Sequence, residues 1–189
     1  MTIKLIVGLR NPGAAYAQTR HNAGGWFVEA LLAQTNTSFK IDKKLNGEWA
    51  NLEMNNLTCK AFLPLSFMNH SGLPVQAICQ FYRIEPHEIL VAHDELDLLP
   101  GRIKLKTGGG HGGHNGLRDI IQQLGSTAFH RLRVGIGHPG HKALVLDYVL
   151  GKPSQSERQL IMDAIDRGTE LIPTILSGHL EIAMSQLNG

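Results

Sequence analysis

Apolar residues recur along the chain in two patterns that predict β-strands. Near residues 3–9 and 89–92 the apolar positions are continuous, as in strands buried on both faces. Residues 102–107 and 131–136 alternate basic and apolar side chains, which predicts strands with one buried and one basic face. Two more strands are expected on either side of a tight turn at residues 55–56. In chain order, the predicted strands cover residues 3–9, 47–54, 57–63, 89–92, 102–107 and 131–136.

Apolar residues three and four positions apart predict helices between these strands. The helices cover residues 21–34, 67–82, 117–124 and 154–171. Ser154 and Glu157 have the spacing of a capping box at the start of the last helix, and Pro173 is expected to separate it from a short final one. The alternation predicts an α/β fold, a single three-layer α/β/α domain over residues 1–189. We expect its sheet to be twisted, mixed and mostly parallel, and a helical tail to begin at about residue 154.

Polar features follow several of the predicted strands. Asn11 comes after the first strand, Asp94 ends the strand that begins at Ile89, and a glycine-rich loop at residues 108–116 follows the strand at residues 102–107. Ligands of α/β folds bind at the carboxyl ends of the strands. We therefore expect these features to face one crevice.

Composition narrows the class of protein. The chain has 189 residues, enough for one well-packed domain, and its 42% hydrophobic content is too high for a disordered chain. No apolar run approaches the roughly 18–20 residues of a membrane span, and the N-terminus lacks the pattern of a signal peptide. Cys59 and Cys79 are too few for a disulfide framework or a four-thiolate zinc site. A reduced, cytoplasmic protein is expected.

Charge is distributed unevenly along the chain. The net charge is only +2, but residues 98–146 hold seven basic residues and one acidic residue, a local charge of +6. The rest of the chain holds eleven basic and fifteen acidic residues, a charge of −4. The same window contains five of the ten histidines. A basic, glycine-rich segment in an otherwise acidic chain predicts a face that binds a polyanion, and a solvated charged surface is the alternative.

Several familiar sites are incomplete in this sequence. The glycine loop contains a G-x-G-x-x-G pattern, but it lacks the acidic residue that would hold a ribose and the lysine of a Walker loop. The histidine pairs His111/His114 and His138/His141 have no carboxylate or cysteine to complete a convincing metal site. No G-x-S-x-G nucleophile elbow occurs.

The remaining candidate chemistry combines a histidine, a carboxylate and amides. His21 lies at the start of a predicted helix, whose N-terminus is expected to lower the imidazole pKa and keep the ring able to accept a proton. Asp94 can orient the ring by accepting its other N–H. Asn11, Asn69 and Asn115 lie in turns or loops, where their amides can bind a carbonyl oxygen or water, or simply form the turn. Together these residues predict hydrolysis of an anionic substrate.

A set of motifs, in order between residue 3 and about residue 153, carries a family resemblance. The motifs occupy residues 8–13, 16, 19–22, 67–72, 93–97, 108–116 and 129–137. In this set the chain resembles the bacterial peptidyl-tRNA hydrolases. The resemblance implies hydrolysis of the ester that joins a peptide to the 3′ end of tRNA, which recycles tRNA after premature dissociation from the ribosome. It also implies a monomeric, cytoplasmic enzyme that uses no cofactor or metal, does not bind membranes, and contacts the CCA end, acceptor stem and 5′ phosphate.

The resemblance assigns roles to single residues. His21 falls on the catalytic histidine and Asp94 on the carboxylate that orients it. Asn11, Asn69 and Asn115 fall on amides that bind substrate and water, with Asn11 counted among the catalytic residues. The other implied contacts are Tyr16, Met68 and His114 for the substrate, and Lys106 and Arg133 for the tRNA 5′ phosphate.

Some features of the sequence leave alternatives open. Arg10, His70 and His141 depart from the family's usual pattern, and Arg10 adds a charge beside the expected site. His21 is expected to act as a general base on water, although direct nucleophilic attack is an alternative. The oxyanion donor is either Asn11 or Asn69. A non-catalytic RNA-binding module and a nucleotide-dependent enzyme are the competing classes of function.

Overall fold

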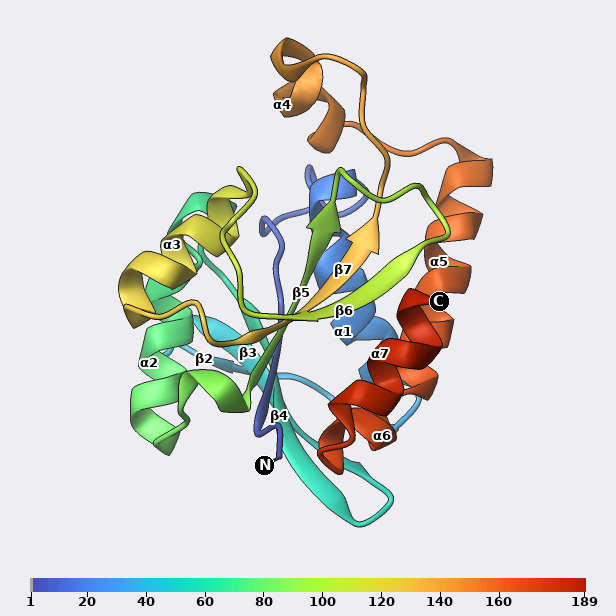
Figure 1. Ribbon diagram of the computed structural model, residues 1–189. Helices are drawn as coiled ribbons and strands as arrows, with labels where there is room; N and C mark the ends of the chain where they lie inside the picture. Colours follow the sequence, from blue (N-terminus) through green and yellow to red (C-terminus); the bar gives the residue numbers. More distant parts are fainter. Residues whose placement is uncertain (1) are drawn as a thin grey trace.

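All the strands described belong to one sheet, in a computed structural model that describes residues 2–189 (Figure 1). Its strand order is β2-β3-β4-β1-β5-β7-β6. The strands are β1 (Leu5–Gly8), β2 (Lys40–Asp42), β3 (Gly47–Met54), β4 (Leu57–Pro64), β5 (Ile89–Glu95), β6 (Ile103–Thr107) and β7 (His130–Gly135). The central strands β4, β1, β5 and β7 are parallel to one another, and antiparallel pairs lie at both edges. The predicted mixed α/β sheet is confirmed, with β2 as the one strand that the sequence analysis did not anticipate.

Helices cover both faces of this sheet (Figure 1). They are α1 (Ala23–Ala33), α2 (Gly72–Tyr82), α3 (Asn115–Leu124), α4 (Val145–Val149), α5 (Gln155–Glu170), α6 (Ile172–Leu176) and α7 (Leu180–Asn188). The predicted capping box forms at Ser154 and Glu157. The region after it follows the prediction in part: α5 ends at Glu170 and Pro173 lies in the first turn of the short helix α6, but a further helix, α7, comes after it. None of the helices in residues 2–189 has the length and hydropathy to cross a bilayer.

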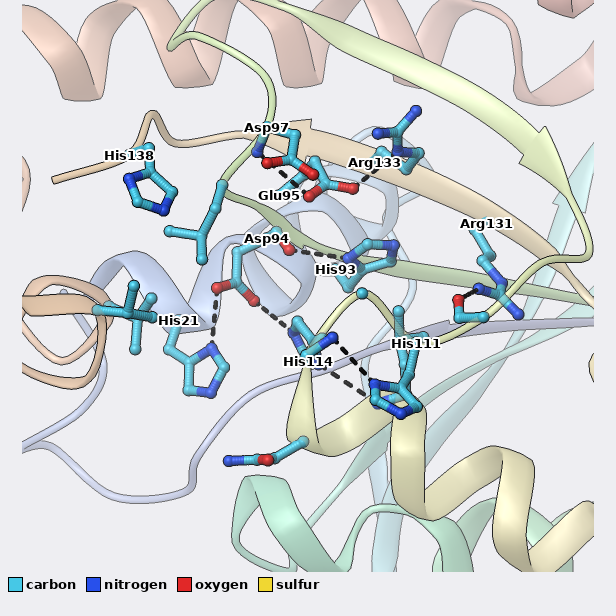
Figure 2. Close-up of a pocket in the computed structure, with 18 of the residues that line it drawn as sticks. His21, His93, Asp94, Glu95, Asp97, His111, His114, Arg131, Arg133 and His138 are labelled. Carbon is cyan, nitrogen blue, oxygen red and sulfur yellow. Dashed lines mark hydrogen bonds and ion pairs between the residues drawn. The ribbon is translucent and has the colours of Figure 1, made fainter. Parts of the chain in front are cut away.

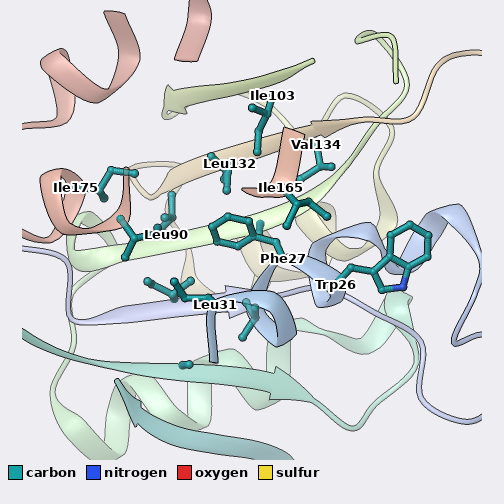
Figure 3. Close-up of a cluster of buried hydrophobic side chains, with 14 of the residues drawn as sticks. Trp26, Phe27, Leu31, Leu90, Ile103, Leu132, Val134, Ile165 and Ile175 are labelled. Atoms are coloured by element: carbon teal, nitrogen blue, oxygen red, sulfur yellow. The ribbon is translucent and has the colours of Figure 1, made fainter. Parts of the chain in front are cut away.

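Alternation along the strands produces two hydrophobic cores, one on each face. Leu5 and Val7 of β1 pack with α2 and α3, whereas Ile6 between them packs with α1 and the C-terminal helices. On that second face Phe27 and Ile165 meet residues of β5, β6 and β7 (Figure 3). The helical tail therefore completes a core.

The start of α1 lies unusually close to the sheet. A Cβ atom on Gly24 would lie 2.2 Å from the carbonyl oxygen of Ala92 on β5, and one on Gly8 would lie 2.6 Å from the carbonyl oxygen of Gly24. Only glycine permits this approach of helix to strand. It brings the turn before α1, which carries His21, against the carboxyl end of β5.

The strand before the glycine loop runs in the opposite direction from its neighbours. β6 is antiparallel to β7, and Thr107 at its end pairs with His130 at the start of β7. The loop therefore leaves the sheet at the edge away from the carboxyl ends of β1, β5 and β7, and residues 108–114 run back across the sheet to reach them. The glycine loop nevertheless lines the same cavity as Asp94, as expected.

The last residues of the chain protect the exposed edge of β6. The Asn188 side chain accepts a hydrogen bond from the Leu105 N–H at 2.8 Å and donates one to the Leu105 carbonyl oxygen at 2.9 Å. Its carboxamide thus replaces a neighbouring strand. An open strand edge invites pairing with another chain, so this contact stabilises β6 and blocks that pairing.

Candidate active site

A cavity of about 670 Å³ opens at the carboxyl ends of β5 and β7, beside α4 (Figure 2). Of the residues singled out from the sequence, His21, Asp94, Lys106, His114, Asn115 and Arg133 line it. The glycine loop contributes one wall, and α4 contributes the apolar side chains of Val145, Leu146 and Val149. Helix α4 was not predicted, because its five residues are too few to show an apolar periodicity.

Asp94 is the centre of the polar network in this cavity (Figure 2). Its Oδ2 lies 2.8 Å from His21 Nδ1, and its Oδ1 lies 2.7 Å from His114 Nε2. A carboxylate accepts hydrogen bonds, so both of these ring nitrogens carry the proton. His21 is thereby left with Nε2 as its unprotonated nitrogen, the tautomer suited to take a proton from a reactant.

The electrostatics differ from the sequence prediction for His21. Burial lowers the pKa of His21, but the charge and the hydrogen bond of Asp94 together raise it by more, so the net pKa lies above the usual histidine value. The predicted lowering was wrong because His21 lies in a 3₁₀ turn before α1 and its ring bonds a carboxylate. The two histidines hold the pKa of Asp94 well below its usual range, against the effect of burial.

His114 joins the network to the next helix. Its Nδ1 accepts the backbone N–H groups of Gly116 and Leu117, at 3.1 and 3.3 Å, and so caps the N-terminus of α3. With Nε2 bonded to Asp94, the ring has both nitrogens engaged. His93 lies behind it, and burial followed by the charge of His114 lowers the pKa of His93 to about 4. No pattern in the sequence indicated these contacts, since histidine is not a usual capping residue.

Asn11 is held by Asn22, the neighbour of His21 in sequence, but it does not line the 670 Å³ cavity. Its backbone N–H donates to Asn22 Oδ1 at 2.8 Å, and Asn22 Nδ2 donates to its carbonyl oxygen at 2.9 Å. Its own Oδ1 accepts the Met68 N–H at 2.7 Å. The carboxamide NH₂ of Asn11 therefore stays available as a donor. Asn22, the neighbour of His21 in sequence, is a positioning residue that the sequence analysis did not identify.

Other predicted contacts lie outside the main cavity. Tyr16 is half-buried and packs edge-on against Phe67, with ring centroids 5.9 Å apart. Asn69 is exposed, and Met68 is buried under Gly116 instead of lining the opening. Neither Tyr16 nor Asn69 lines the 670 Å³ cavity.

Arg10 lines a second cavity of about 360 Å³ together with Asn11. Its guanidinium binds Glu29 Oε1 at 2.9 Å and Glu48 Oε2 at 2.7 Å. Two carboxylates thus compensate the extra positive charge that this residue adds beside the site.

The register of β6 and β7 gathers basic side chains on one face. Lys104 pairs with Arg133 and Lys106 pairs with Arg131, while the residues between them face the core. Arg133 Nε binds Glu95 Oε1 at 2.8 Å, and its Nη atoms remain free to bind another anion. The predicted basic face is confirmed, and Lys106, Arg131 and Arg133 line the cavity that contains Asp94.

One group in the described residues has the spacing of a metal site. Ligand atoms of His21, Asp94 and His114 lie within 4.8 Å of one another. The same three residues are joined by the hydrogen bonds of His21 Nδ1 and His114 Nε2 to the Asp94 carboxylate, and a metal ion bound there would displace protons from its ligands.

Comparison with known proteins identifies the family of the chain. The family model described as peptidyl-tRNA hydrolase matches residues 5–189. The chain belongs to the peptidyl-tRNA hydrolase family. A Legionella pneumophila (strain Corby) peptidyl-tRNA hydrolase is 65% identical over 188 residues, covering 100% of both chains. An Edwardsiella ictaluri (strain 93-146) peptidyl-tRNA hydrolase is 56% identical, covering 100% of this chain and 97% of that one.

Solved peptidyl-tRNA hydrolase structures share the fold in detail. The crystal structure of the Acinetobacter baumannii peptidyl-tRNA hydrolase has a TM-score of 0.96 and 49% sequence identity, covering 99% of this chain and 95% of that one. The order of sheet strands and helices described above is therefore that of the peptidyl-tRNA hydrolase fold.

Proposed function

We propose that this chain hydrolyses the ester bond of peptidyl-tRNA, with His21 as the general base. The hydrogen bond between His21 Nδ1 and Asp94 Oδ2 carries the proposal, because it leaves Nε2 as the basic nitrogen of a ring in the cavity. The choice of peptidyl-tRNA as the substrate follows from membership of the peptidyl-tRNA hydrolase family. We also propose that the protein is a single-domain monomer that acts in the cytoplasm and needs no metal.

The reaction begins with water. His21 Nε2 removes a proton from a water molecule, whose oxygen bonds to the ester carbonyl carbon. The bond from that carbon to the ribose oxygen then breaks, and the imidazolium returns its proton to the ribose oxygen. Asp94 stabilises the imidazolium, and the free NH₂ of Asn11 is the proposed donor to the oxyanion. Asn69 is exposed and is the weaker candidate, while Asn115 is proposed to hold the water.

The tRNA is proposed to lie along the basic strands. Lys106 and Arg133 would hold the 5′ phosphate, with the free Nη atoms of Arg133 suited to a phosphate oxygen pair. Cβ atoms added at Gly110, Gly112 or Gly113 would meet nothing within 4 Å, so the loop leaves space for the CCA end. Met68, Tyr16 and His114 are proposed to position the ester and peptide.

Single-turnover release of labelled peptide from peptidyl-tRNA tests this function. We expect the purified chain to release peptide with EDTA present, and His21→Ala to lose about 10²–10⁴-fold in rate while tRNA binding persists. His87→Ala is the matched control, since its side chain lies outside the cavity. Binding without release would favour the RNA-binding module, and a trapped acyl-enzyme would favour attack by His21 itself.

A further inference from the structure

Arg131 is a basic residue buried at the edge of the cavity. It lies on β7 opposite Lys106, yet only 2% of its surface is exposed. A buried guanidinium requires hydrogen-bond acceptors to offset the loss of water. Arg131 finds them in the backbone: Nη1 donates to the Gly110 carbonyl oxygen and Nη2 to the Gly109 carbonyl oxygen. The guanidinium also stacks over the Phe129 ring, 4.5 Å from its centroid.

The loop that Arg131 holds has few other attachments. Gly108 N–H donates to the Phe129 carbonyl oxygen at 3.0 Å, which is the last sheet-like bond. Beyond it, in the part of the chain that the structure describes, the bonds from Arg131 are the only hydrogen bonds that connect residues 109–113 to any residue outside the segment 108–114. The loop nevertheless delivers His114 to Asp94 with a separation of 2.7 Å between Nε2 and Oδ1.

We propose that Arg131 is a positioning residue that fixes the glycine loop, so that His114 meets Asp94 and Asn115 faces the cavity. The inference rests on the proposed function for its kinetic consequence, whereas its structural consequence is independent of any activity. A direct phosphate contact is the competing role. Both Nη atoms of Arg131 already bond the loop and its Nε is enclosed, so the side chain offers a phosphate much less than Arg133 does.

Replacing the arginine with lysine separates these two roles. Arg131→Lys keeps the positive charge but loses the planar fork that reaches two carbonyls at once. Arg133→Lys is the matched control, the same substitution two residues along the same strand. Hydrogen–deuterium exchange is measured at the N–H groups of His114, Gly116 and Leu117, which are bonded within or just after the loop.

We expect these amides to exchange roughly 10-fold faster or more in Arg131→Lys, and at the wild-type rate in Arg133→Lys. In peptidyl-tRNA hydrolysis, Arg131→Lys should lower kcat about 10-fold with little change in KM. Unchanged exchange together with a raised KM and a weaker salt dependence would overturn the proposal in favour of phosphate binding. If the wild-type chain released no peptide, the proposed function would fail, but the exchange comparison would still decide the role of Arg131.

A second variant covers the case in which Arg131→Lys does not fold. Gly109 has φ +98°, a backbone conformation that is strained for any residue with a Cβ atom. Gly109→Ala therefore disturbs the loop at its bond to Arg131 while leaving the arginine in place. The same faster exchange at His114 is expected, and wild-type exchange in this variant would contradict the proposal.

Discussion

The Asp94 network and the basic strands line the same cavity but are built in opposite ways. Asp94 is 4% exposed, and both of its carboxylate oxygens bond histidines. Lys106 is exposed and forms no ion pair within residues 2–189, and Arg133 uses only Nε on Glu95. One region is closed and internally satisfied, whereas the other keeps its donors free for a ligand.

This difference determines which conditions act on each region. Charges in a buried, hydrogen-bonded cluster interact in a low dielectric and are little screened by salt. Exposed cations lose most of their long-range interaction at moderate ionic strength. The chemical step, which depends on the Asp94 network, should therefore vary with pH, and substrate binding by the basic strands should vary with salt. Variants of both regions test this difference, in order of decreasing effect.

Asp94→Asn should have the largest effect. It removes the interactions that raise the pKa of His21 and leaves burial, which lowers it. The acid limb of the kcat/KM profile, which reports the free enzyme, should therefore begin above the usual histidine pKa in the wild type and move to lower pH in the variant. The plateau rate should fall by about 10³–10⁴-fold, because the ring loses its fixed tautomer and its counter-charge. Single-turnover rates measured across the histidine titration range check both effects.

The same substitution has a consequence for stability. The His21 contribution is fully present below the unfolded-state histidine pKa and is lost as pH rises through the raised folded value. The Asp94 contribution is present above the unfolded-state carboxyl pKa and is lost as pH falls through the lowered folded value.

Asp97→Asn is the control for the pH profile of Asp94→Asn. Asp97 is an exposed carboxylate that lines the same cavity, so this substitution should leave the acid limb in place. An unmoved acid limb in Asp94→Asn would contradict the assignment of His21 as base.

His114→Ala should have the next largest effect. It removes a hydrogen bond to a charged carboxylate and the cap of α3. A bond of that kind contributes about 1.5–3 kcal/mol to stability and the cap contributes more, so thermal stability should fall clearly, and kcat should fall roughly 10-fold because Asp94 loses one of its two partners. His111→Ala is the matched control, because its Nδ1 accepts only the Gly113 N–H inside the loop. Equal rate losses in both variants would show that the loop, and not the Asp94 bond, is responsible.

Much of the fold could be predicted because local and tertiary preferences agree. The hairpin strands β3 and β4 fall within one residue of their predicted bounds, since alternation and the Asn55-Asn56 turn point to the same register. The capping box at Ser154 is likewise a local feature. Strand β2 has only three residues, and the strand direction of β6 depends on its partner, so neither could be derived from periodicity.

The site could be predicted in composition but not in detail. His21 and Asp94 were expected to meet because His21 lies at the start of a helix and Asp94 at the end of a strand, and both positions face the carboxyl ends of the strands. The sign of the His21 pKa shift could not be obtained, because it depends on a 2.8 Å contact between residues 73 positions apart. Asn22 and Arg131 were missed for a related reason, since their polar atoms bind backbone groups that the sequence does not bring together.

Lys106→Ala and Arg133→Ala should change binding and not the chemical step. We expect KM for peptidyl-tRNA to rise about 10-fold, and the slope of log KM against log salt to fall by about one for each phosphate interaction that the substitution removes. The kcat should stay near the wild-type value. Asp94→Asn provides the opposite pattern, a lower kcat with an unchanged salt slope. A fall in kcat for Arg133→Ala on a short ester substrate that lacks the tRNA body would contradict the separation of the two regions.

Asn188→Ala should have the smallest effect. It removes contacts that stabilise β6, one of the two basic strands. The variant loses both bonds between the Asn188 carboxamide and the Leu105 backbone, which together contribute about 1–2 kcal/mol to the free energy of unfolding. Urea unfolding should show this loss, whereas Gln186→Ala, in an exposed residue of α7, should not. Uncovering the β6 edge should also increase self-association at high protein concentration. Because β6 keeps its pairing with β7, kcat should not change, and a loss of kcat would mean that the edge contact reaches the Asp94 network.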